Sequence, residues 1–218
     1  MLTEIKFSED RFYRTGLQNE PSKFYNDALS NSNQFDLFVG KLSLNSINFF
    51  TFGFATFIRN NGKMRIVFNL HFEKMELLDF LKSLDATGKH FFNCVAWMIS
   101  HRRIQLQIIN PKSGFAVYKS GIFSDGKNSV SFDSSTNFNS HGWLENFEEL
   151  EMYLSWEEGR SMKMIDKRRN DFEILLSDKT DSAEFINTIV SQFGNKSLND
   201  LLIQEKILVK KLGFINAN

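Results

Sequence analysis

The sequence is poor in cysteine and proline, and its charges balance. Of 218 residues, one is cysteine and two are proline. A single cysteine, Cys94, excludes a disulfide framework and a cysteine-rich zinc site. The 26 basic and 26 acidic side chains give a formal net charge of zero. Any contact with nucleic acid must therefore come from local basic clusters and not from bulk charge.

Long apolar runs are also missing. No run approaches the roughly 20 residues that cross a bilayer, and the segment after Met1 lacks the basic and apolar regions of a secretory signal. These absences predict an intracellular, cytoplasmic protein with no membrane contact. The four histidines and the cysteine are dispersed without metal-ligand spacing, so we expect neither a metal nor another cofactor.

Phenylalanine is unusually abundant, with 24 residues, and predicts an aromatic core. Hydrophobic residues make up 42% and charged residues 24%, which are ordinary values for a globular protein. The length suits one α/β domain, with or without a helical tail, and is sufficient to bury a core without metal or disulfide support.

Hydrophobic periodicity and turn residues divide the chain into strands and helices. An edge strand is expected at 2–7 and a helix at 22–29, opened by Pro21. The remaining predicted strands are 35–39, 64–68, 104–108, 115–123, 129–132 and 149–156. The remaining predicted helices are 44–59, 74–84, 89–100, 157–176, 182–193 and 198–212.

This order predicts an α/β fold, because strands that alternate with helices favour a parallel sheet covered on both faces. The three later strands follow one another closely and extend it. We therefore expect a mixed, mostly parallel sheet flanked by helices. We place one domain at 1–178 and a C-terminal helical extension at 179–218.

The residues with chemical potential lie between 115 and 148. Lys119 occurs in the first of three short segments, Ser134 and Asn137 in the second, and Glu148 in the third. In type and spacing they resemble the motif of the phospholipase D-like superfamily: His-x-Lys, an acidic position, Gly-Ser-x-x-Asn and a later Glu. Asp125 lies near the acidic position, whereas Asp133 stands where the motif has glycine and could repel a phosphate.

The wider sequence is similar to one subgroup of this superfamily. The segments 28–40 and 53–65 resemble its first strand–helix–strand unit, so the resemblance spans roughly 10–178. The subgroup comprises bacterial nucleases and modules that precede helicases in restriction and phage-defence proteins. The resemblance implies the superfamily's fold, with Lys119, Ser134, Asn137 and Glu148 as phosphate-binding residues.

Val117 occupies the position of the motif histidine. The family uses that histidine as the nucleophile on phosphorus, and a single-motif chain completes its site by forming a symmetric dimer. Valine has no lone pair and cannot act as an acid or a base. The resemblance therefore implies a homodimer without a catalytic residue of the family's route. The lysine and serine could still hold a phosphate.

Two further features bear on function. His141 lies in the segment after Asn137 and is the least implausible displaced nucleophile, although a loop or surface histidine explains it more simply. Arg160, Lys163 and Lys167 share one face of a predicted helix and could contact a phosphate backbone, or form a solvated face balanced by neighbouring glutamates. The segment 101–103, His-Arg-Arg, is a second basic cluster.

Three functions stay open from the sequence. The first is a degenerate phospholipase D-like module that binds DNA or a partner, such as a helicase domain or subunit, in a restriction or phage-defence assembly. The second is an active, metal-independent phosphodiesterase or nuclease with a displaced nucleophile. The third is an interaction domain whose helices after residue 180 dock another protein.

Overall fold

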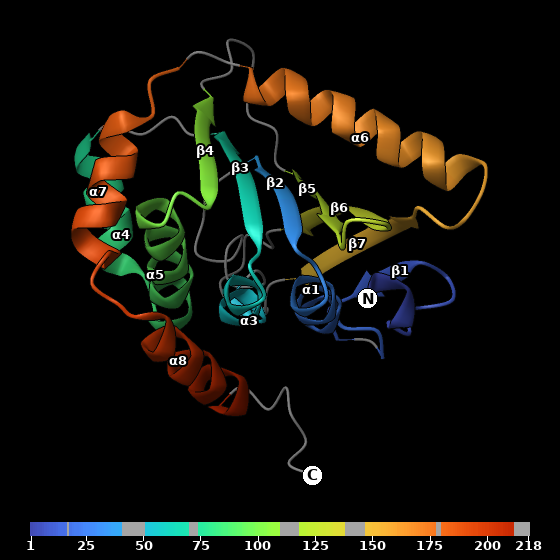
Figure 1. The fold of residues 1–218 in the computed structure, drawn as a ribbon, viewed down its shortest axis with the longest axis horizontal. Coiled ribbons are helices and arrows are strands. Elements are labelled where there is room, and N and C mark those ends of the chain that lie inside the picture. Colours follow the sequence, from blue (N-terminus) through green and yellow to red (C-terminus); the bar gives the residue numbers. More distant parts are fainter. Residues whose placement is uncertain are drawn as a thin grey trace.

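The structure is a computed structural model, and it describes residues 1–16, 18–40, 51–69, 74–109, 118–137, 147–177 and 180–211 (Figure 1). Within these ranges, the side chains at 74–76, 118, 135–137, 147–148 and 211 are not described. The predicted α/β class is confirmed: a mixed sheet of seven strands lies between helices.

The described sheet has the strand order β1-β7-β6-β5-β2-β3-β4. Its parallel part consists of β2, β3 and β4, and the other neighbouring strands are antiparallel. The strand bounds are β1 (Phe12–Arg14), β2 (Gln34–Val39), β3 (Lys63–Asn69), β4 (Ile104–Ile109), β5 (Tyr118–Ser124), β6 (Ser129–Asn137) and β7 (Phe147–Leu154).

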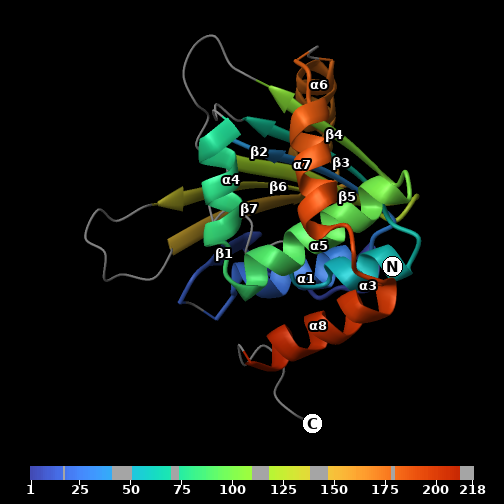
Figure 2. The same ribbon diagram turned by 90° about the vertical axis from the view of Figure 1, so that its left-hand side faces the viewer.

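Helices cover both faces of this sheet (Figure 2). A short 3-10 helix, Leu2–Glu4, begins the chain. The α-helices are α1 (Pro21–Ser30), α3 (Phe54–Arg59), α4 (Lys74–Ser83), α5 (Ala86–Ser100), α6 (Arg160–Leu176), α7 (Ala183–Phe193) and α8 (Leu198–Lys211). Pro21 opens α1 as predicted, because its missing N–H and fixed φ suit the first helical turn.

The larger core lies between the sheet and the layer that contains α1, α3 and α5. It is aromatic, as the composition predicts: the rings of Phe35 and Phe123 stack with centroids 4.2 Å apart, and Phe132 stacks 5.5 Å from Phe123. Phe24 of α1 meets both Phe123 and Phe132 edge-on. Offset and edge-to-face ring pairs add to the stabilisation from buried area.

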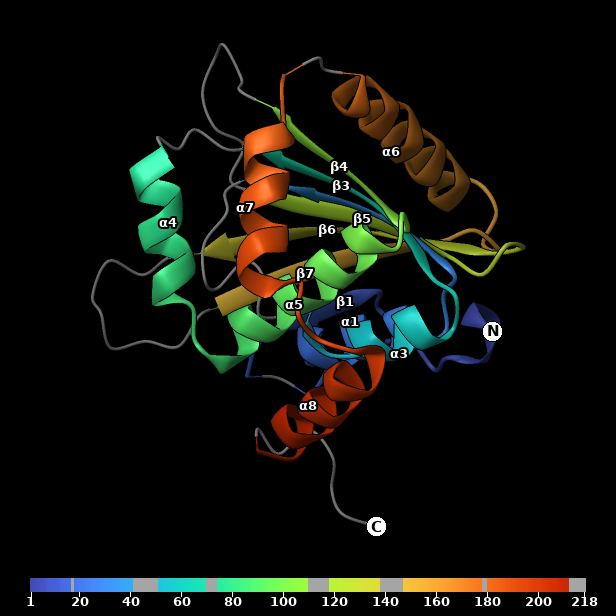
Figure 3. The ribbon, with the colours of Figure 1, turned by 60° about the vertical axis from the view of Figure 1, so that its left-hand side comes forward.

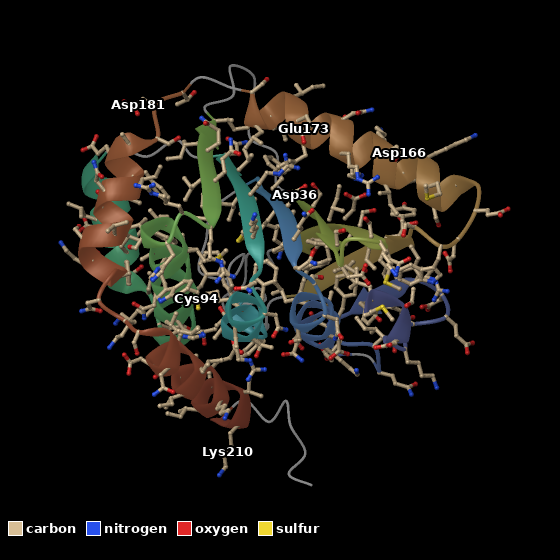
Figure 4. All side chains as sticks on the ribbon, in the orientation of Figure 1. Asp36, Cys94, Asp166, Glu173, Asp181 and Lys210 are labelled. Carbon is tan, nitrogen blue, oxygen red and sulfur yellow. The ribbon has the colours of Figure 1, made fainter. Side chains whose placement is uncertain are left out.

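A smaller core lies on the opposite face, where α6 crosses the sheet. Phe172 of α6 packs with Phe38, Val67 and Ile109. Arg65 of β3 donates hydrogen bonds to Asp36 of β2, at 2.6 and 2.7 Å, and to Glu173 of α6, at 2.7 Å. Figure 4 labels Asp36 beneath α6 and Glu173 on that helix. The ion pairs therefore bind α6 to the parallel part of the sheet.

Two sequence predictions are wrong. The segment 2–7 is not an edge strand, because Leu2–Glu4 is a 3-10 helix and the edge strand is Phe12–Arg14. The described sheet is also not mostly parallel, since four of its six neighbouring strand pairs are antiparallel. The physical reason is that β5 lies antiparallel beside β2, and the short turn between β5 and β6 makes the next pair antiparallel as well.

The C-terminal helices share the main core. Phe185, Ile189 and Phe193 of α7 and Leu201 of α8 belong to the same buried cluster as the sheet. The ring of Phe185 lies 5.7 Å from that of Phe68 on β3. These helices pack as part of the fold, and the domain boundary at 178/179 stays a prediction.

Candidate functional site

Lys119 and Ser134 lie side by side on β5 and β6. Their Cα positions are direct partners in the antiparallel ladder, and each residue is 2% exposed. Strand alternation places them on the face of Phe123 and Phe132, toward α1. Burying a lysine is costly unless polar or anionic groups compensate its charge. A buried ammonium beside a hydroxyl is therefore a chemically significant arrangement.

The site lies at the edge where the parallel strands end. Val39, the last residue of β2, is the partner of Lys119 on β5. The carboxyl ends of β2, β3 and β4 meet at this edge, because these strands are parallel and in register. In open α/β sheets ligands bind outside the carboxyl ends of the strands.

Glu148 and Asn137 lie next to this pair in backbone register. Glu148 is the partner of Thr136, one ladder position from Asn137, which pairs with Phe147. The side chains of Asn137 and Glu148 are outside the described part, and their phosphate-binding roles stay predictions.

Val117 and His141 lie outside the described residues. The structure therefore places neither the valine at the motif histidine position nor the speculative alternative nucleophile. Both assignments stay predictions from the sequence.

Asp133 does not face Lys119. Its carboxylate accepts a hydrogen bond from Arg168 of α6, on the opposite face of the sheet from Ser134. Burial raises the pKa of Asp133, and the neighbouring Arg168 lowers it only in part. The sequence suggested that this aspartate could repel a bound phosphate, but in the structure its charge is directed to the far face and compensated there.

Asp125, near the acidic position of the motif, has a structural role. It lies in the turn between β5 and β6, where Oδ1 accepts the N–H groups of Lys127 and Asn128, and Oδ2 accepts that of Leu2. Burial raises the pKa of this carboxyl, but the donated N–H bonds outweigh it and lower the pKa overall. The turn is at the opposite end of β5 from Lys119.

The three predicted nucleic-acid contacts lie on α6, as the helical spacing required. Arg160, Lys163 and Lys167 are all exposed. Lys167 also lines a groove of about 570 Å³ between α6 and the sheet, which contains four carboxylates. These are Asp133, Glu149, Glu151 and Asp171. The carboxylates weaken the local positive potential, and the contact stays a prediction.

In the described ranges, no three His, Cys, Asp or Glu side chains converge as a metal site. No helix within the same ranges is long and apolar enough to span a bilayer.

The chain matches no protein-family model and no curated protein. Among solved structures, it is similar to polyphosphate kinase from Porphyromonas gingivalis, with a TM-score of 0.45 and 13% identity over 77% of this chain and 26% of that one. It is also similar to a mutant of yeast tyrosyl-DNA phosphodiesterase, with a TM-score of 0.37 and 17% identity over 82% of this chain and 39% of that one. The chain spans about a quarter and two fifths of their lengths, and at these TM-scores neither likeness bears on function.

Proposed function

We propose that this chain is a degenerate phospholipase D-like module that binds the phosphate backbone of nucleic acid and does not cut it by the family's route. One observation carries the proposal: a fully buried lysine, Lys119, lies beside Ser134 at the edge where the parallel strands end. The sequence adds Val117 at the position of the motif histidine. A role in a restriction, phage-defence or helicase assembly is part of the same proposal.

The chemistry of the pair supports binding. An ammonium and a hydroxyl can each donate a hydrogen bond to a phosphate oxygen, and charge-assisted bonds are about twice as strong as neutral ones. Burial strengthens these bonds further, because the local dielectric constant is low. Neither group is an imidazole, so the pair lacks the nucleophile of the family's route and can still hold a phosphodiester.

A homodimer belongs to this proposal. The chain carries one copy of the motif, and the resembled family completes such sites across a two-fold axis. In a symmetric dimer, both copies would bring Lys119 and both would lack the histidine.

The test uses a dinucleotide, which offers a single phosphodiester and so reports on one site. Its affinity for the full chain is measured by calorimetry with wild type, Lys119→Met and Ser134→Ala. Loss of one charge-assisted hydrogen bond should weaken binding about tenfold in Lys119→Met and less in Ser134→Ala. Lys89→Met removes an exposed lysine on α5 and should leave binding unchanged.

Circular dichroism and thermal melting establish that each variant is folded. Ser134→Ala keeps the test informative if Lys119→Met fails to fold. A folded wild type that does not bind the dinucleotide, or folded Lys119→Met and Ser134→Ala variants that bind it as wild type does, would overturn the proposal.

A further inference from the structure

The opposite edge of the sheet forms a second surface, away from Lys119. The first residues of the parallel strands meet there: Gln34 of β2 is the partner of Lys63 on β3, and Met64 pairs with Ile104 of β4. Gln34 also pairs with Ser124, where β5 ends in its hairpin to β6. Figure 3 shows this hairpin on the same side of the sheet as the starts of β2 and β4.

Unpaired cations gather at this edge. Arg59, Lys63, Arg102 and Lys127 are exposed, and none of them has a carboxylate within 4.0 Å in the described part of the chain. In contrast, Arg65 is held by two carboxylates. Although the whole chain has no net charge, four cations without nearby carboxylates produce a local positive potential at this edge.

Arg102 has an unusual backbone conformation. Its φ is +55°, and it follows the C-terminal end of α5, where its N–H donates to the carbonyl of Ile99. Glycine or asparagine usually takes the left-handed position after a helix, because a side chain is strained there. An arginine at this position keeps a long cation at the edge at a cost in local stability. Strain of this kind is concentrated at functional sites.

The cations border a groove of about 450 Å³, whose lining includes Lys63, Arg102, and the amides of Gln34 and Gln105. Asp36 is the one carboxylate among its described lining residues, and Arg65 neutralises it. Asp125 of the nearby hairpin is engaged by three backbone N–H groups. The groove therefore offers positive charge and hydrogen-bonding amides with little opposing charge.

We infer that this edge is a binding surface for the phosphate backbone of a nucleic-acid strand, centred on Lys63 and Arg102 and flanked by Arg59 and Lys127. Adjacent strands are about 4.8 Å apart, so the edge from β4 to β5 spans about 14 Å. One strand of a duplex presents a phosphate about every 3.4 Å, and several phosphates fit along this edge. This surface would bind the same kind of partner as the Lys119 site, but it contains none of the residues of that site.

The experiment measures fluorescence anisotropy of a labelled 20-nucleotide single strand with the full chain, across a series of salt concentrations. The test variant is Lys63→Gln combined with Arg102→Gly. The control is Lys89→Gln combined with Lys206→Gln, which removes two exposed lysines from α5 and α8 and gives the same net charge. Lys119→Met is measured in parallel.

The expected result for the test variant is affinity about tenfold below that of the control at low salt. The slope of log affinity against log salt should fall by about 1.4, because two phosphate contacts are lost. Its melting temperature should not fall below that of Lys63→Gln alone, because glycine relieves the strain at position 102. Lys119→Met leaves Lys63 and Arg102 in place, so its slope should fall by no more than about 0.7, whatever its effect on the dinucleotide.

Equal affinity and slope in the test and control variants would overturn the inference. Absence of any oligonucleotide binding by wild type at low salt would also overturn it. Dinucleotide binding that fails while the slope change persists would overturn only the Lys119 site, so the two proposals fail separately.

Discussion

Asp133 shows how one residue can depart from a motif without disturbing the neighbouring site. It follows Phe132 and precedes Ser134 in a regular strand, so its side chain belongs to the face opposite both. There it pairs with Arg168, and the two side chains are 25% and 19% exposed. The sequence alone identified the substitution, but it could not supply the partner, which lies 35 residues further along the chain.

The Asp133–Arg168 ion pair leads to a prediction about the effect of a single side chain on stability. Arg168→Met leaves a largely buried carboxylate without its main cation, which should cost about 1–3 kcal/mol of unfolding free energy at pH 7. The cost should shrink in acid, because the protonated carboxyl needs no cation. Burial raises the pKa of Asp133 above its usual value of 3.8, so the folded state binds the carboxyl proton more tightly than the unfolded state. The stability loss in Arg168→Met should therefore grow as the pH rises through the raised pKa of Asp133 and its carboxyl becomes charged.

Urea unfolding of wild type and Arg168→Met at pH 7 and near pH 4 provides the measurement. The double variant Asp133→Asn with Arg168→Met is the control, and it should recover part of the loss at pH 7. A loss that is equal at both pH values, or that the double variant does not reduce, would show that Arg168 acts through packing instead.

At the scale of elements, the sequence predicted the helices and strands better than their pairing. α3 ends at Arg59, as the helix predicted at 44–59 does, although in the described residues it begins only at Phe54. The predicted strands at 35–39 and 64–68 lie within β2 and β3. Strand neighbours were not predictable, because periodicity says nothing about which strand β5 lies beside. The three-residue β1 was missed because so short a strand has no detectable alternation.

Glu205 of α8 is an element-scale contact that the sequence did not reveal. It is 6% exposed, its Oε2 accepts the N–H of Ala55 at 2.7 Å, and its Oε1 accepts the hydroxyl of Thr56 at 3.2 Å. His90 of α5 approaches Oε2 at 3.6 Å. Cys94, one turn along α5, has a pKa raised by burial and then by the charge of Glu205. This buried carboxylate joins α8 to α3 and α5.

We therefore predict that Glu205→Ala loosens α8 selectively. Removing the carboxylate leaves a buried N–H and a hydroxyl without an acceptor, at a cost of about 2–3 kcal/mol. Hydrogen exchange followed by mass spectrometry should show faster exchange in α8 with little change in the strands. Glu205→Gln should cost less, since its amide oxygen still accepts, and Lys206→Ala on the exposed side of α8 should have no effect.

At the scale of the whole molecule, the two ends of the sheet differ in whether their positive charges are buried or exposed. The end at Lys119 carries a buried ammonium, whereas the other end carries four exposed cations without carboxylate partners in the described ranges. The sequence indicated Lys119 and Ser134 through the resemblance of their motif, but not the burial of the lysine. At the other end it indicated only the basic segment 101–103, because Lys63, Arg102 and Lys127 are far apart in the chain and meet only through strand order.

We propose that the Lys119 site holds a phosphodiester and leaves it intact. The most direct measurement incubates the full chain with an end-labelled oligonucleotide and a metal chelator, then analyses the recovered strand on a denaturing gel. We expect full-length strand from wild type and from Lys119→Ala alike. Fragments that form with wild type and disappear with Lys119→Ala would contradict it, and loss of those fragments in His141→Ala would identify the displaced nucleophile.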